Sequence, residues 1–176
     1  MNTTGLSFAE LNFPEPQPQQ LRSMYDRIRQ RLLALYLERG ILTEDELWYF
    51  IRHYLKWTIP RRNVCPEHQS PFSFISDQFF ERAKTVFGWA NRGGGKTLCV
   101  AILNVVESLF KPGIEITCAG AIEQQANKGY EYVTKMMFSE PLLLRTLVSS
   151  LRSSTEFFNG SAIKITTGTY HGLKSP

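Results

Sequence analysis

One stretch of this chain governs how the rest is interpreted: Ala90-Asn91-Arg92-Gly93-Gly94-Gly95-Lys96-Thr97. Glycine has no side chain that restricts or shields the backbone. Three consecutive glycines can therefore adopt a turn in which their N–H groups point inward and bind an anion. Lys96 adds a positive charge, and a helix starting there adds the free N–H groups and dipole of its first turn. The stretch has the form of a phosphate-binding loop, with Ala90 at the usual first glycine.

The residues on either side of this loop have the pattern that such a loop needs. Residues 85–90 (TVFGWA) form a short apolar run that is typical of a buried strand, and residues 97–110 are apolar nearly all round, which predicts a helix that Pro112 and Gly113 end. A strand, a glycine-rich turn and a helix in this order predict an α/β fold. We expect a P-loop NTPase-like parallel sheet with flanking helices.

The chain after the loop continues to alternate between strands and helices. Its pattern predicts a strand over 114–119, a helix over 121–138 and another helix from Ser139 to about Leu151. Asn159-Gly160, between TEFF and SAIKITT, predicts a β-hairpin whose two central residues have positive φ. Two parallel strands are fewer than the usual sheet of about four to six, so we expect an incomplete sheet.

The chain is predicted to have three parts. Residues 1–18 contain alternating prolines and predict a flexible Pro/Gln-rich arm. Residues 19–58 predict a helical hairpin, with a helix over 20–39 that Gly40 ends and a second helix that the capping box at 43–46 opens. Residues 59–176 predict the N-terminal part of a P-loop ATPase domain, beginning with a proline-rich loop over 58–72 and a short helix over 73–83.

Each helix of the predicted hairpin carries apolar residues at helical spacing, so each should bury one stripe. In the first helix the stripe consists of Leu21, Met24, Tyr25, Ile28, Leu32, Leu35 and Tyr36. In the second it consists of Leu47, Ile51, Tyr54 and Leu55.

The composition limits the class of protein. Hydrophobic residues make up 43% of the 176 residues, which excludes general disorder. The net charge of +4 is compatible with nucleic-acid binding but does not indicate it. Three cysteines do not make a disulfide framework, and no apolar run reaches the roughly 18 residues of a membrane span. We therefore expect a soluble cytoplasmic protein.

The loop residues have expected roles in binding ATP and Mg²⁺. Lys96 should reach the β- and γ-phosphates, and the hydroxyl of Thr97 should ligate Mg²⁺. Arg92 could contact the γ-phosphate, or it could point to solvent or pair with a carboxylate. Upstream, the amide of Gln69 is a candidate for reading adenine, since an amide both donates and accepts, and Gln78 is a weaker candidate.

The acids needed for hydrolysis are not recognisable in the sequence. ATP hydrolysis at such a site requires an acid for Mg²⁺ and a group that orients water. The three aspartates, Asp26, Asp45 and Asp77, all precede Lys96, and no apolar run ending in Asp-Glu follows the loop. We expect the chain to bind Mg-ATP but to hydrolyse it slowly, as the N-terminal part of a larger motor domain would.

Five elements follow one another over residues 69–175: HQSPF, ANRGGGKT, ITCAGAIEQQA, FFNGSAIKIT and GLKSP. In this order they resemble the ATPase region of the large subunit of tailed-phage terminases, the motors that package viral DNA. It implies the ATP-binding portion of a packaging motor, truncated before the acidic strand. Carried over, Lys96 and Arg92 have catalytic roles, Thr97 binds Mg²⁺ and Gln69 contacts adenine.

The same resemblance implies partners and a location. The partners are double-stranded DNA, bound through the full motor, the portal, the small terminase subunit and further copies of the chain in a ring. The location is the host cytoplasm, away from membranes. In such rings an arginine of one subunit completes the neighbour's site, and Arg145 and Arg152 lie in the right part of the chain.

Other interpretations stay open from the residues alone. A helicase-like P-loop ATPase would share the glutamine segment. A small-molecule kinase would need a substrate-binding lid and acidic residues after the loop, and neither is recognisable in the sequence. A truncated product without catalysis is a third alternative, so the sequence leaves enzymatic activity undecided. Cys65 and His68 supply two zinc ligands, but a structural site requires four.

Overall fold

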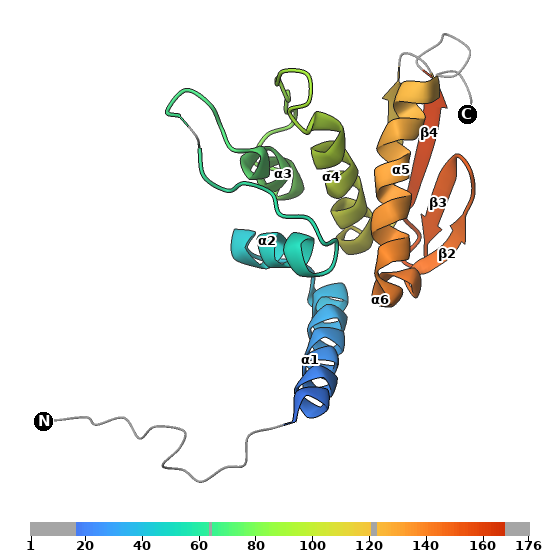
Figure 1. The fold of residues 1–176 in the computed structure, drawn as a ribbon. Coiled ribbons are helices and arrows are strands. Elements are labelled where there is room, and N and C mark those ends of the chain that lie inside the picture. Colours follow the sequence, from blue (N-terminus) through green and yellow to red (C-terminus); the bar gives the residue numbers. More distant parts are fainter. Residues whose placement is uncertain (1–16, 64, 121–122, 168–176) are drawn as a thin grey trace, which may run out of the picture. The chain divides into compact units, whose positions relative to one another are not determined.

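The computed structural model describes residues 17–63, 65–120 and 123–167 (Figure 1). The chain forms two compact units, Met1–Glu38 and Arg39–Pro176. The predicted arm falls almost wholly outside the described residues, as does the GLKSP element. The three-part division of the chain stays a prediction.

The first unit is described through α1 (Pro18–Arg39), which confirms the first predicted helix. Its apolar residues do not form one buried stripe. Leu33 and Tyr36 are buried, whereas five members of the predicted stripe are 42–53% exposed: Leu21, Met24, Tyr25, Ile28 and Leu35. The stripe prediction is wrong for these five because the described part of this unit contains no second element to cover them.

The second unit is an α/β fold with an open, mixed four-stranded sheet. Its elements are α2 (Glu44–His53), α3 (Pro71–Phe79), α4 (Lys96–Phe110), β1 (Glu115–Gly120), α5 (Glu123–Ser139), α6 (Pro141–Leu144), β2 (Leu147–Ser150), β3 (Ser154–Phe157) and β4 (Ala162–Thr167). The strand order is β1-β4-β3-β2, with β1 parallel to β4 and the other pairs antiparallel. The prediction of a parallel sheet is therefore wrong, because the hairpin joins the same sheet as β1.

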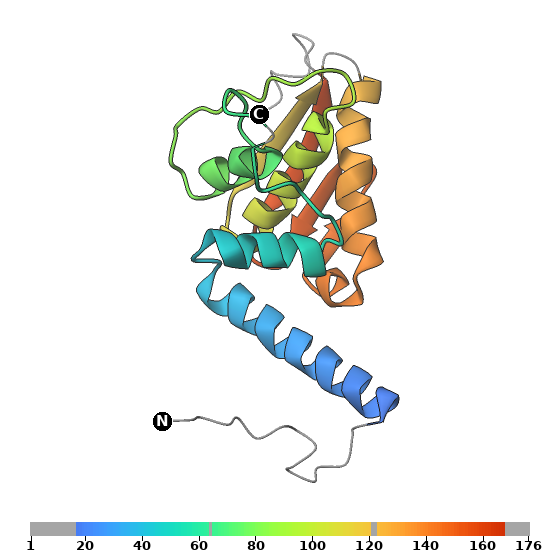
Figure 2. The ribbon, with the colours of Figure 1, turned by 60° about the vertical axis from the view of Figure 1, so that its left-hand side comes forward.

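Helices α4 and α5 lie against β1 and β4, α3 packs on α4, and α2 contacts α3 (Figures 1 and 2). On the helix side of the sheet, Ile116 pairs with the fully buried Ile163. On the other side, Lys164 and Glu115 form an exposed ion pair at 2.7 Å. The sheet thus buries one face and presents a polar face to solvent. Of the helices in the described ranges, none combines the length and apolar content that crossing a bilayer requires.

Helix α2 forms as the sequence predicts. The Thr43 hydroxyl accepts from the N–H of Glu46 at 3.2 Å, and the Glu46 carboxylate accepts from the N–H of Leu42 at 2.9 Å. The predicted stripe of Leu47, Ile51, Tyr54 and Leu55 is at most 1% exposed. Together, the cap sets where this helix begins and the stripe attaches it to the core.

Two segments differ from their sequence-based predictions. Residues 85–90 form no strand: Phe87 is 91% and Trp89 100% exposed, and no strand of the described sheet pairs with them. The helix predicted to reach Leu151 ends at Leu144, and β2 follows. In both cases pairing across the sheet, rather than local apolar composition, determines whether the segment extends as a strand.

The predicted hairpin is confirmed, but its turn differs. Phe158, Asn159 and Gly160 form a three-residue loop in which the N–H of Gly160 donates to the Phe157 carbonyl at 3.0 Å. Only Gly160 has positive φ, at 81°; Asn159 does not. This is a type I turn followed by a left-handed glycine, and it requires one positive φ where the predicted two-residue turn requires two.

We expect Gly160→Ala to lower the free energy of unfolding by about 1–2 kcal/mol, because alanine is strained at this φ. The added methyl has room, since its nearest neighbour is the Gly113 Cα at 3.9 Å. Gly129→Ala, inside α5, is the matched control and should stabilise the chain by up to about 1 kcal/mol. Urea unfolding measures both, and a Gly160→Ala chain as stable as wild type would contradict the turn assignment.

Candidate functional site

The stretch 90–97, called the glycine loop below, requires glycine at each of its three central positions. Gly93 and Gly95 have φ of 86° and 76°, which side chains rarely adopt. Gly94 is limited by space instead: a Cβ there would lie 2.9 Å from the Ala90 Cβ and 2.9 Å from Asn91 Oδ1. The loop is therefore a tight, exposed turn that leads directly into α4.

The side chain of Lys96 folds back across the glycine loop. Its Nζ donates to the carbonyl oxygen of Asn91 at 2.8 Å and to that of Ala90. The charge thus lies over the loop rather than extending into solvent. Backbone carbonyls are weak partners for an ammonium compared with an anionic oxygen, so a phosphate could replace them.

The start of α4 leaves backbone donors free beside this lysine. The first N–H of the helix with a backbone acceptor is that of Cys99, which donates to Gly95 at 3.0 Å. The cap residue Gly95 has no side chain to accept from the first turn. Within the described ranges, the N–H groups of Lys96, Thr97 and Leu98 have no acceptor, and together with the helix dipole they favour an anion at this end.

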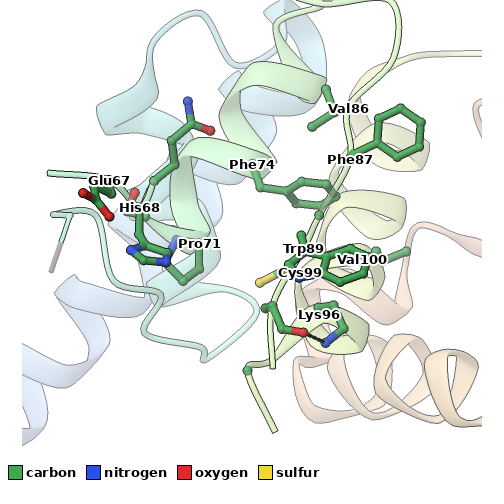
Figure 3. Close-up of a pocket in the computed structure, with 15 residues that line it drawn as sticks. Glu67, His68, Pro71, Phe74, Val86, Phe87, Trp89, Lys96, Cys99 and Val100 are labelled. Carbon is green, nitrogen blue, oxygen red and sulfur yellow. Dashed lines mark hydrogen bonds between the residues drawn. The ribbon is translucent and has the colours of Figure 1, made fainter. Parts of the chain in front are cut away.

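An open cavity of about 870 Å³ adjoins the glycine loop (Figure 3). Ala90, Gly94 and Lys96 line it from the loop, and residues 86–89 continue this wall. Residues 67–71 and Phe74 line it from the side of α3, and Cys99 and Val100 from α4. This volume lies within the range of about 300–1,000 Å³ that is usual for small-molecule sites.

Short-range hydrogen bonds at the start of α3 fix the residues that line the cavity on this side. The Ser70 hydroxyl accepts from the N–H of Ser73 at 3.2 Å, and Pro71 occupies the first turn of α3. The N–H of Ser70 donates to Asn63 Oδ1 at 2.8 Å, which fixes the preceding loop. These contacts place Gln69 at the cavity, although it lies far from Lys96 in the sequence.

The structure brings some of the predicted site residues together and leaves others apart. Gln69, Ala90, Gly94 and Lys96 line one cavity. The others do not line it, although several belong to the glycine loop: Asn91, Arg92, Gly93, Gly95, Thr97, and also Gln78, Arg145 and Arg152. Arg92 is exposed and makes no ion pair with any residue in the described ranges.

The sequence did not point to the aromatic lining of the cavity. Phe74, Phe87 and Trp89 all line it. A Cβ on Gly88 would lie 3.4 Å from the Phe74 ring, so the chain approaches this ring closely. The signal was present in the run VFGW, but a strand interpretation assigned these side chains to the core.

The ionisable residues of the cavity wall lie apart. Figure 3 shows Glu67 and His68 on the far side of the cavity from Lys96. Burial raises the pKa of the Cys99 thiol, so this side chain is a neutral part of the wall.

Metal ligands are few in the described parts of the chain. No group of three or more His, Cys, Asp or Glu side chains gathers there. Cys65 Sγ lies 2.8 Å from His68 Nδ1, a pair that is two ligands short of a structural zinc site. The exposed Thr97 hydroxyl, at the first turn of α4, is a hard oxygen donor of the type that Mg²⁺ accepts.

The chain matches no protein-family model, and no curated protein matches it significantly. Functional interpretation therefore depends on the glycine loop, its lysine and the cavity beside them.

Proposed function

We propose that this chain binds Mg-ATP through residues 90–97 and is the ATP-binding part of a viral DNA-packaging motor. The observation that carries the proposal is the Lys96 ammonium, which is folded over a glycine loop at the edge of a cavity that Gln69 also lines. A cation, free backbone donors and an amide that can read a base are the groups that a nucleoside triphosphate requires.

Binding of the triphosphate requires little rearrangement of the lysine. Nζ would exchange the carbonyls of Ala90 and Asn91 for β- and γ-phosphate oxygens. The free N–H groups at the start of α4 would donate to the same phosphates. Because the loop already has its turn conformation, less conformational entropy is lost on binding.

Magnesium would be held mainly by the nucleotide. Thr97 would supply one oxygen, and phosphate oxygens and water the others, as is usual for Mg²⁺. The metal neutralises phosphate charge when bound. Exposed Arg92 would extend the positive surface of the loop toward the γ-phosphate.

The motor assignment is supported by the order of the elements that resemble the terminase large subunit. Poor turnover by this chain is part of the proposal. Glu67 is the carboxylate at the cavity in the described residues, and it lies on the far side from Lys96. Without an acid beside the phosphates, water is not activated.

We expect purified chain to bind a fluorescent ATP analogue saturably, more tightly with Mg²⁺ than with EDTA, and to release phosphate slowly. The ratio of affinity with Mg²⁺ to affinity with EDTA should be about tenfold smaller in Thr97→Ala than in wild type. This loss is on the scale of one hydrogen bond to a charged group. Thr97→Ser is the matched control, because it keeps the hydroxyl and removes only the methyl that faces Gly129.

The outcomes separate the parts of this proposal. Lack of saturable binding by wild type would reject nucleotide binding itself. An unchanged Mg²⁺ effect in Thr97→Ala would reject the metal role of that residue. Rapid phosphate release would show that a carboxylate acts at the site after all.

A further inference from the structure

Trp89 is in an unusual environment for a tryptophan. Its side chain is 100% exposed, although it lines the cavity beside the glycine loop. Tryptophan is mostly buried in folded proteins because its large apolar surface is costly to leave in water. An indole that faces an open cavity is therefore available to a ligand with an apolar, planar surface.

The surroundings of Trp89 indicate which ligand this is. Figure 3 shows Trp89 beside Lys96 and Val100, on the loop side of the cavity, and the ring of Phe74 reaches from α3 toward the same segment. An aromatic surface and an ammonium thus adjoin one space. A nucleotide has the complementary chemistry, with a planar base at one end and phosphates at the other.

We propose that the indole of Trp89 stacks on the base of the bound nucleotide. The inference rests on the proposed binding of a nucleoside triphosphate by the glycine loop. Stacking uses the π-face that every base has, so Trp89 would add affinity without choosing among bases. Any choice among bases would come from Gln69, the amide on the same cavity.

The backbone links this stacking to phosphate binding. Trp89 directly precedes Ala90, whose carbonyl accepts from the Lys96 ammonium. When Nζ moves to a phosphate, the Ala90 carbonyl loses this partner, so phosphate binding changes the contacts of the residue next to Trp89.

The test compares Mg-ATP with Mg-tripolyphosphate, which has phosphates but no base, by isothermal titration of the full chain. Trp89→Ala should weaken Mg-ATP binding by about 5- to 150-fold, the range measured for removing a base-stacking aromatic. It should change tripolyphosphate affinity less than about twofold, since no base is present. Trp89→Phe should retain most of the ATP affinity because it keeps an aromatic face.

Fluorescence gives a second, independent readout. The chain has three tryptophans, and Trp48 and Trp57 do not line the cavity. Mg-ATP should quench part of the intrinsic emission in wild type, and this quenching should disappear in Trp89→Phe. Tripolyphosphate should quench neither protein.

Each failure has a separate meaning. Tripolyphosphate binding with unchanged ATP affinity in Trp89→Ala would overturn the stacking inference and leave the phosphate loop standing. Equal weakening of both ligands would also overturn it, since Trp89 would then support the loop rather than the base. Failure of wild type to bind either ligand would reject the proposed function as well.

Discussion

Lys96→Ala should weaken binding of Mg-ATP by about 2–4 kcal/mol, or roughly 30- to 1,000-fold, because the polyphosphate loses the ammonium that would pair with its charged oxygens. Among the described residues, this ammonium donates to two neutral carbonyls of the loop and forms no ion pair. Neutral carbonyls do not neutralise the ammonium, so it can form an ion pair with the phosphates of the ligand. Titration of a fluorescent ATP analogue into both proteins measures the difference.

Two variants define the source of this effect. Lys128→Ala removes an exposed lysine of α5 that does not line the cavity, and it should leave affinity within about twofold since surface charges contribute little. Lys96→Arg keeps the charge but replaces a compact ammonium with a planar fork, so it should only partly restore binding. Equal affinity of wild type and Lys96→Ala would be incompatible with a phosphate-binding loop.

Phe50→Ala should lower the free energy of unfolding by about 3–5 kcal/mol, the usual cost of emptying a buried aromatic site. Phe50 is 0% exposed, and its ring centroid lies 4.9 Å from that of Phe110 in an edge-to-face contact. Phe110 in turn contacts Phe79 at 6.4 Å. These rings join α2, α3 and α4, so the cavity left by alanine would affect three helices.

Phe138→Ala is the matched control, because Phe138 is 58% exposed on α5. It should change stability by less than about 0.5 kcal/mol, as surface substitutions usually do. Urea unfolding followed by circular dichroism measures both variants. Similar losses from the two substitutions would show that the Phe50–Phe79–Phe110 contacts do not form a core.

Local signals in the sequence predicted several elements correctly. Thr43 and Glu46 mark the start of α2 through hydrogen bonds that span only a few residues. The glycine loop likewise depends on the φ of Gly93 and Gly95 and on the close approach to Gly94, all within a single turn. Such features are predictable because the interacting atoms are near neighbours along the chain.

Long-range pairing accounts for the incorrect predictions. Residues 147–150 lie in the stretch that was predicted to be helical, but Leu147 pairs with Phe157 and Ser150 with Thr155 in the sheet. Residues 85–90 have a strand-like composition but no partner among the described strands. Composition expresses a local preference, and a strand forms only where a second strand satisfies its backbone.

The glycine loop, its lysine and the helix that follows are predictable from the amino-acid sequence alone, because backbone sterics and short-range hydrogen bonds act between adjacent residues. Packing of the folded chain brings Gln69, Trp89 and Lys96 to one cavity. The same packing makes the sheet mixed and leaves Trp89 facing solvent. These properties depend on packing between segments distant in the chain, which local preferences do not encode.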